Sequence, residues 1–167
     1  MKHVQVYSIE NFDRLQEEAL SHIPVSEHAI YGDYDVHGNP EKWDGNSKTY
    51  SDVAKRMAND AIEKYCESWG CSSATFNTLW YHVYNEGGSY MSHTHTLANM
   101  TGVIHLLLED ERDFTNIVGY NGKIKEGEVV LFPSMTPHES KPVHGKKIII
   151  GFNWDMYSDM KTHKEVQ

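Results

Sequence analysis

Two histidines, His93 and His95, stand two positions apart in the stretch GGSYMSHTHTLANMTG. Side chains at positions i and i+2 of an extended strand lie on the same face, so both imidazoles can point the same way. A third histidine, His138, follows much later, in FPSMTPHES. Two histidines from one strand and one from a distant strand can occupy three adjacent positions around a metal ion and leave the others open. That arrangement is typical of non-haem iron sites.

The same pattern has a plainer interpretation, because the chain holds 11 histidines and an H-x-H on a polar surface can arise by chance. The flanking residues favour the metal site. Gly87 and Gly88 precede the pair and indicate a tight turn that delivers the strand. The apolar run EVVLF leads into Pro133 shortly before His138.

Two lysines, Lys146 and Lys147, open the apolar run IIIGF after a turn at Gly145. A lysine in a buried strand is unfavourable unless its charge meets an anion. One interpretation places both lysines at the solvent end of the strand. The other places one of them inside the fold, where it holds a carboxylate ligand.

The elements that must position these residues change character at about residue 74. Before that point the apolar periodicity predicts one strand and two helices, at 3–9, 11–22 and 50–69. We expect Asn11 and Ser51 to cap the two helices and Gly70 to follow the second. Residues 31–48 are rich in Gly, Asp and Asn and predict a long surface loop, whose Asp33, Asp35 and Asp44 contact a substrate or are simply solvated.

From there to about residue 157, six or seven β-rich runs are separated by turn signals, and no helical pattern intervenes. Such a series predicts an antiparallel sandwich or barrel. We therefore expect a mainly β fold with N-terminal helices. The chain is predicted to be a single domain over 1–167, in which a helical and loop segment over 1–72 packs on a β core over 73–157.

Composition limits the class of protein. With 167 residues, 39% of them hydrophobic, the chain is expected to be one globular domain. A net charge of −9 disfavours general nucleic-acid binding. No apolar run has the length of a signal peptide or a membrane span, so a cytoplasmic protein without a membrane partner is expected. Cys66 and Cys71 are interpreted as free thiols.

The run from Tyr84 to Asn153, less than half of the chain, resembles the Fe(II)/2-oxoglutarate-dependent oxygenases, particularly their prolyl-hydroxylase-like branch. It is also similar to a poorly characterised H-x-H group of that superfamily. Three segments carry the resemblance, namely YNEGGSYMSHTH, TGVIHLLLE and GEVVLFPSMTPHESKPVHGKKIIIGFN. The resemblance implies a double-stranded β-helix, that is, a jelly roll or cupin-like barrel, with Fe(II) and 2-oxoglutarate as cofactors.

The resemblance also implies roles for individual residues. The iron ligands would be His93, His95 and His138, and the cofactor-binding residues would be Lys147, Tyr84, Tyr90 and His105. Lys147 matches the basic residue that binds the far carboxylate of 2-oxoglutarate. Tyr84 and Tyr90 match two tyrosines before the first ligand, and His105 stands where a tyrosine often touches the co-substrate. His82, which shares a predicted strand face with Tyr84, lines the pocket or packs in the core.

One position departs from the usual pattern. Most of the superfamily has Asp or Glu where this chain has His95. A neutral imidazole leaves the site one charge more positive and weakens Fe(II) binding relative to competing metals. His95 is nevertheless kept as a ligand, because the poorly characterised group also has H-x-H there.

The implied activity is that of a 2-oxoglutarate-dependent dioxygenase, which uses O2 to hydroxylate a peptide side chain or a small molecule and releases succinate and CO2. The sequence does not specify the substrate or the oligomeric state, a homodimer being one option.

The main alternative is a cupin-type metal-binding protein, either a small-molecule dioxygenase or isomerase or a non-catalytic ligand-binding module. Gly87-x5-His93-x-His95 fits the first cupin motif, but the glutamate expected soon afterwards is absent and Lys147 has no role in it. A third possibility is a binding or structural protein whose metal site has decayed at His95.

Overall fold

The structure is a computed structural model that describes residues 2–23 and 47–158. Its elements, in chain order, are β1 (Gln5–Ser8), α1 (Phe12–Leu20), α2 (Ser47–Trp69), β2 (Ser73–Tyr84), β3 (Tyr90–His93), β4 (Met100–Leu108), β5 (Asn116–Ile117), β6 (Glu128–Pro133), β7 (His138–Ser140) and β8 (Lys147–Tyr157). The predicted strand, the two helices and the change to β structure after them are confirmed. The predicted loop over 31–48 falls largely outside the described residues, together with Asp33, Asp35 and Asp44.

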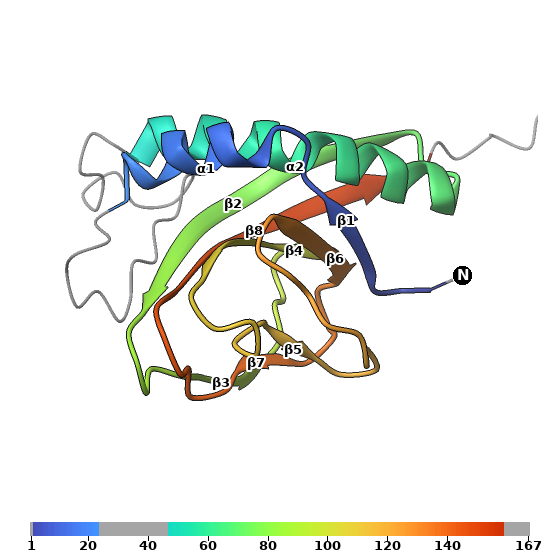
Figure 1. Ribbon diagram of the computed structural model, residues 1–167. Coiled ribbons are helices and arrows are strands. Elements are labelled where there is room, and N and C mark those ends of the chain that lie inside the picture. The colour runs from blue at the N-terminus through green and yellow to red at the C-terminus, as the bar shows by residue number, and fades with distance from the viewer. Residues whose placement is uncertain (1, 24–46, 159–167) are drawn as a thin grey trace, which may run out of the picture.

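The strands form two antiparallel sheets. The larger sheet has the order β1-β6-β4-β8-β2 and the smaller one has the order β3-β7-β5. In Figure 1 the small sheet lies below the large one, and the chain passes repeatedly between them. Val103, Phe132 and Ile149 belong to the apolar cluster between the two sheets. This arrangement is the predicted double-stranded β-helix.

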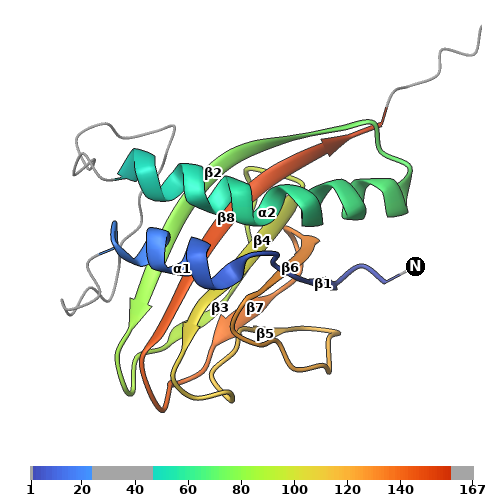
Figure 2. The same cartoon turned by 45° about the horizontal axis from the view of Figure 1, so that its top comes forward.

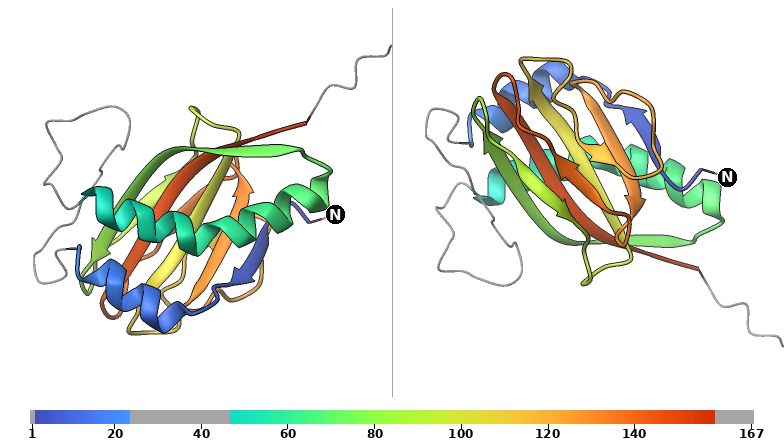
Figure 3. Two further views of the ribbon diagram at one scale, coloured as in Figure 1. Left: turned by 90° about the horizontal axis from the view of Figure 1, so that it is seen from above. Right: turned by 90° about the horizontal axis from the view of Figure 1, so that it is seen from below.

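Both helices lie on the outer face of the large sheet, away from the small sheet (Figures 2 and 3). Val53 and Tyr65 of α2 are fully buried and belong to one cluster with Ile148 and Trp154 of β8. The central strands are therefore covered on both faces, which explains their nearly continuous apolar sequences. Neither described helix has the length and apolarity that a bilayer crossing requires. Because the helices occupy the outer face, only the inner face of the large sheet, which faces the small sheet, can contribute residues to a site between the sheets.

The helix ends differ in part from the predictions. Asn11 precedes α1 in a left-handed conformation with φ of 53°, and its side chain makes no capping hydrogen bond. Asn11 thus occupies the predicted N-cap position of α1 without the expected side-chain bond. Ser51 lies inside α2, because that helix begins at Ser47, so the second predicted cap is wrong. Gly70 does follow α2, with φ of +65°, and this left-handed residue ends the helix as expected.

Candidate metal centre

His93 and His138 are brought together by strand pairing. β3 and β7 are antiparallel neighbours, and His93 lies directly opposite His138 in their register. The centroids of the two imidazole rings are 4.3 Å apart. Two residues far apart in the sequence thus become cross-strand neighbours, which is the relation a shared ligand requires.

His95 joins them from outside the strand. β3 ends at His93, so the prediction that both histidines project from one strand is wrong. The backbone N–H of His95 donates to the carbonyl of Ser134 at 2.9 Å, which holds this segment beside the end of β6. The His95 ring lies 5.1 Å from that of His93 and 5.0 Å from that of His138. A ligand nitrogen from each histidine lies within 4.8 Å of the others, and the group could hold a metal ion.

Backbone carbonyls fix the tautomer of two of the rings. Nδ1 of His93 lies 2.9 Å from the Met91 carbonyl oxygen, and Nδ1 of His138 lies 3.0 Å from that of Thr136. A carbonyl oxygen only accepts, so Nδ1 carries the proton and Nε2 keeps a free lone pair.

The spacing of two of the imidazole nitrogens suits a shared ion. Nε2 of His138 lies 3.2 Å from Nε2 of His95. Two nitrogens bound at right angles to one ion, each at about 2.1 Å, lie about 3 Å apart.

His138 is also electrostatically suited to bind a cation. The pKa of His138 is lowered to about 4, chiefly by burial; the Thr136 carbonyl acts in the opposite direction, and the nearby His93 makes a smaller lowering contribution. His138 is therefore neutral at pH 7, and no proton competes with a metal ion for its Nε2.

Lys147 is fully buried at the start of β8, with 0% of its surface exposed. Its Nζ donates to the Ser140 hydroxyl at 2.9 Å and lies 5.2 Å from the centroid of the Tyr84 ring. Across residues 2–23 and 47–158, no carboxylate forms a salt bridge with it. Burial lowers the pKa of Lys147 to about 7, although Asp113 raises it. Lys147 is thus the lysine inside the fold, whereas Lys146 is only partly buried.

Ser140 connects the lysine to the histidines, and the sequence analysis missed it. It stands two positions after His138 on β7 and is likewise buried. Alternate residues of a strand share a face, so His138 and Ser140 project to the same side. The available signal was this i, i+2 spacing in the segment HES.

The two tyrosines line the same interior. Tyr84 is buried, lies opposite Lys147 in the β2–β8 register and has its hydroxyl 3.1 Å from Nδ1 of His82. The Tyr90 ring meets that of His93 edge to face, with centroids 4.6 Å apart, and lies 5.4 Å from that of His82. His82 is itself buried and belongs to this aromatic group.

His105 is fully buried on β4, and one side of its ring is engaged. Its Nε2 accepts a hydrogen bond from the Thr115 N–H at 3.1 Å. Burial and then the charge of Lys147 lower the pKa of His105 to about 3, against the opposite effect of the Glu128 and Val103 backbone. His105 is a neutral residue beside the buried lysine, and its contact with a co-substrate stays a prediction.

A second group of possible ligands, Asp110, Asp113 and His144, also lies within 4.8 Å. Its atoms are already engaged. The Asp113 carboxylate accepts from the backbone N–H groups of His144 and Gly145 at 2.8 and 3.1 Å and contacts Nδ1 of His144 at 2.7 Å. Asp110 accepts from the Arg112 guanidinium. This group holds the turn before Lys147, and we assign no metal to it.

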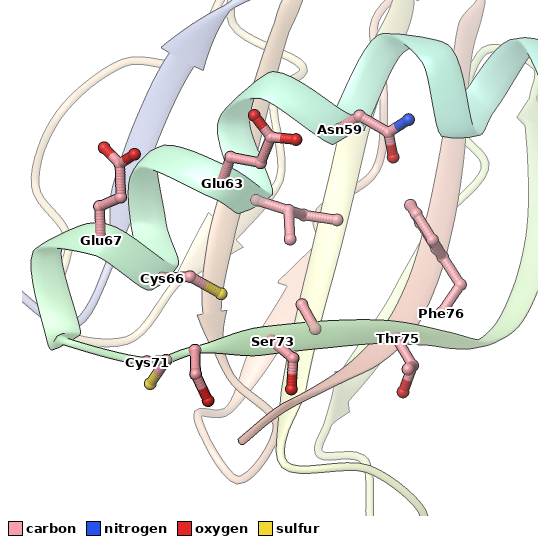
Figure 4. A pocket seen from close by; sticks show the side chains of 11 residues that line it. Asn59, Glu63, Cys66, Glu67, Cys71, Ser73, Thr75 and Phe76 are labelled. Carbon is pink, nitrogen blue, oxygen red and sulfur yellow. The ribbon is translucent and has the colours of Figure 1, made fainter. Parts of the chain in front are cut away.

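A groove lies away from the histidines, between α2 and the start of β2 (Figure 4). Cys66 and Cys71 line it, and neither forms a disulfide. Burial raises the pKa of the Cys66 thiol, which disfavours the reactive thiolate. The groove contains none of the predicted site residues.

Solved structures with the same fold include prolyl hydroxylases and a 2OG-Fe(II) oxygenase family protein. A viral collagen prolyl hydroxylase from Paramecium bursaria Chlorella virus-1, solved with 2OG, has a TM-score of 0.62 at 16% identity, covering 93% of this chain and 96% of its own. A 2OG-Fe(II) oxygenase family protein from Burkholderia pseudomallei has a TM-score of 0.63 at 9% identity, covering 91% and 84%.

A third similar structure is a prolyl hydroxylase from Trichoplax adhaerens in complex with a peptide fragment of hypoxia inducible factor. It has a TM-score of 0.57 at 16% identity, covering 99% of this chain and 88% of its own. No protein-family model and no curated protein matches the sequence. At these identities the likeness establishes the fold, which is the one found in 2OG-Fe(II) oxygenases.

Proposed function

We propose that the chain is an Fe(II)- and 2-oxoglutarate-dependent oxygenase that hydroxylates a peptide side chain or a small molecule. The observation that carries the proposal is the combination of three converging histidines with one fully buried lysine that has no carboxylate partner among the described residues. The fold supports it, since one similar structure was solved with 2OG and another with a peptide.

The histidines fit an Fe(II) ion. His93, His95 and His138 would bind it through imidazole nitrogens, and three protein ligands leave further positions open for a co-substrate and oxygen. The Met91 and Thr136 carbonyls already direct the proton of two rings away from such an ion. These two hydrogen bonds orient the ligands before a metal arrives.

The lysine fits a dicarboxylate. Lys147 would bind the far carboxylate of 2-oxoglutarate, with the Ser140 hydroxyl beside it. With Lys147 protonated, the ion (+2), three neutral imidazoles and 2-oxoglutarate (−2) leave the assembled site with a net charge of +1, the one extra positive charge that follows from an imidazole in place of a carboxylate at His95. The cupin alternative leaves this buried ammonium without an anion, which is unfavourable.

The cofactors supply the oxidation. Bound Fe(II) and 2-oxoglutarate would convert O2, with release of succinate and CO2, into the oxidant that hydroxylates the substrate. The chain itself binds and orients the components. Val103, Phe132 and Ile149 line the interior between the sheets with apolar side chains, and the Tyr84 ring lies against the lysine.

We further propose a cytoplasmic enzyme that acts on a peptide or a small molecule. The two cysteines are free, as is usual in a reducing compartment. The similar structure with a bound peptide makes peptides the first substrates to test.

An anaerobic titration tests the proposal. We expect a weak visible absorption band near about 500 nm, a property of the Fe(II)–2-oxoglutarate pair, when both are added to the protein. Once O2 is admitted, succinate production should rise with the correct peptide or small molecule. A protein that binds Fe(II) but develops no band and forms no succinate would instead support the cupin or the non-catalytic alternative.

A further inference from the structure

The ring of His95 rests against an aromatic side chain. Trp80 projects from β2, and the centroids of its ring and of the His95 imidazole are 5.3 Å apart, with an interplanar angle of 22°. Offset-stacked aromatic pairs at this separation are attractive. The indole therefore restricts how the His95 ring can tilt.

Trp80 owes its position to a glycine. Gly151 lies opposite Trp80 in the β2–β8 register. A Cβ atom at Gly151 would lie 2.5 Å from both Nε1 and Cε2 of the indole, which no real side chain tolerates. The indole thus lies directly on the backbone of β8, and any residue other than glycine would displace it from this position.

The backbone of His95 has a separate support. Its N–H donates to the Ser134 carbonyl, and the Ser134 hydroxyl lies 3.1 Å from that of Thr101. Thr101 donates its only hydroxyl proton to Oδ1 of Asn153 at 3.1 Å, so Ser134 is the donor to Thr101. Nδ2 of Asn153 donates to the Thr78 hydroxyl at 3.0 Å.

This chain of hydrogen bonds links β2, β8 and β4 to Ser134, the residue just after β6. Thr101, Ser134 and Asn153 are all buried. Buried polar groups that satisfy one another in this way hold the surrounding backbone in one arrangement. The segment that carries His95 is thereby fixed to the large sheet.

We propose that Trp80, lying on Gly151, is a positioning residue for His95, and that the chain from Thr78 to Ser134 fixes the backbone of the same ligand. The inference rests on the proposed metal site and explains how an imidazole can replace the usual carboxylate. An imidazole presents a nitrogen in one direction only, whereas a carboxylate can bind through either oxygen. The indole face also stabilises the positive charge that the ring gains on binding a metal.

A double-mutant cycle on metal affinity tests this. The cycle compares wild type, Trp80→Leu, His95→Asp and the double variant by anaerobic titration with Fe(II), with no 2-oxoglutarate and no turnover. Trp80→Leu should weaken Fe(II) binding about tenfold in the wild-type background, as loss of a support behind a ligand does. Trp80→Leu should change the Fe(II) affinity little in the His95→Asp background, because a carboxylate at position 95 does not depend on stacking against the indole for its orientation.

Two further variants sharpen the result. Trp80→Phe keeps a stacking ring and should restore most of the affinity, while Gly151→Ala should resemble Trp80→Leu. Trp69→Leu, which changes a partly buried tryptophan at the end of α2, is the matched control and should bind Fe(II) like wild type. If the carboxylate variant binds no metal, His95→Ala takes its place in the cycle.

The outcomes separate the two proposals. If wild type binds no Fe(II), the metal centre itself is refuted. If wild type binds Fe(II) and Trp80→Leu binds it equally well, only the positioning role is overturned. An equal loss in both backgrounds also overturns it, because Trp80 would then act on the whole site rather than through His95.

Discussion

His93 and His138 face each other across the β3–β7 pair, with their ring centroids 4.3 Å apart. Each ring is oriented by a carbonyl of its own segment. We expect His93→Ala and His138→Ala each to weaken Fe(II) binding, measured by anaerobic calorimetry, on the order of a hundredfold or more. His3→Ala, at an exposed histidine beside Trp69, is the control and should bind like wild type. Unchanged affinity in either ligand variant would place the metal elsewhere.

The two adjacent lysines offer a matched pair of substitutions. Lys147 is fully buried, whereas Lys146 is partly exposed. Lys147→Met keeps the length of the side chain and removes the charge, so 2-oxoglutarate binding should fall at least tenfold while Fe(II) binding persists, since a charged hydrogen bond contributes about 1.5–3 kcal/mol. Lys146→Met should bind both normally. Titration of the visible band with 2-oxoglutarate measures both variants, and equal behaviour of the two would remove Lys147 from the site.

The affinity for 2-oxoglutarate should depend on pH through Lys147. Burial lowers the pKa of Lys147 to about 7 in the free protein, and a bound carboxylate must raise it, because an opposite charge favours the ammonium. Below pH 7 the lysine is already protonated and contributes no pH dependence. Above pH 7 binding requires uptake of a proton, so the affinity should fall by up to about tenfold per pH unit.

Dissociation constants for 2-oxoglutarate between pH 6 and 9 would show this slope. Arginine keeps its charge throughout that pH range, so Lys147→Arg should remove the dependence of 2-oxoglutarate affinity on pH. A wild-type affinity that does not change with pH would mean that Lys147 is not the carboxylate partner.

Gly102 on β4 makes room for a large ring. A Cβ atom there would overlap the ring of Phe152 on the neighbouring strand β8. Gly102→Ala should therefore lower the free energy of unfolding by about 1–3 kcal/mol through overpacking, as measured by urea denaturation. Phe152→Leu removes the overlapping atoms, so the double variant should lose less stability than the sum of the single variants. Strict additivity would contradict the overlap.

The sequence motifs singled out His93, His138 and Lys147 as candidate site residues because their order and spacing match those of the resembled family. The apolar run after Lys146 and Lys147 left open whether either lysine is buried, and only the family resemblance pointed to Lys147. Sequence motifs do not reveal the pairing register of the strands, that is, which residues lie opposite one another in neighbouring strands. Trp80 meets Gly151, and His93 meets His138, through hydrogen-bonded pairings between strands distant in the sequence, and no local pattern encodes these pairings.

The other differences are local. His95 lies beyond the strand that the i, i+2 spacing suggested, because β3 ends at His93 and the following backbone bonds to Ser134 instead. Asn11 lies before α1 in a left-handed conformation, which asparagine tolerates better than most residues. An asparagine at this position correctly indicated the start of a helix, but the capping hydrogen bond expected of its side chain is absent.

The small sheet is built from short strands, with four residues in β3, three in β7 and two in β5. Because so few hydrogen bonds join these strands, local opening of the small sheet requires little free energy. A metal ion held by His93 and His138 would cross-link β3 to β7. Amide hydrogen exchange should then slow in β3 and β7 when metal binds, and stay the same in β4 and β8 under the helices. Metal binding and closure of the small sheet would be one coupled equilibrium, and loss of the ion would open the small sheet at the three histidines.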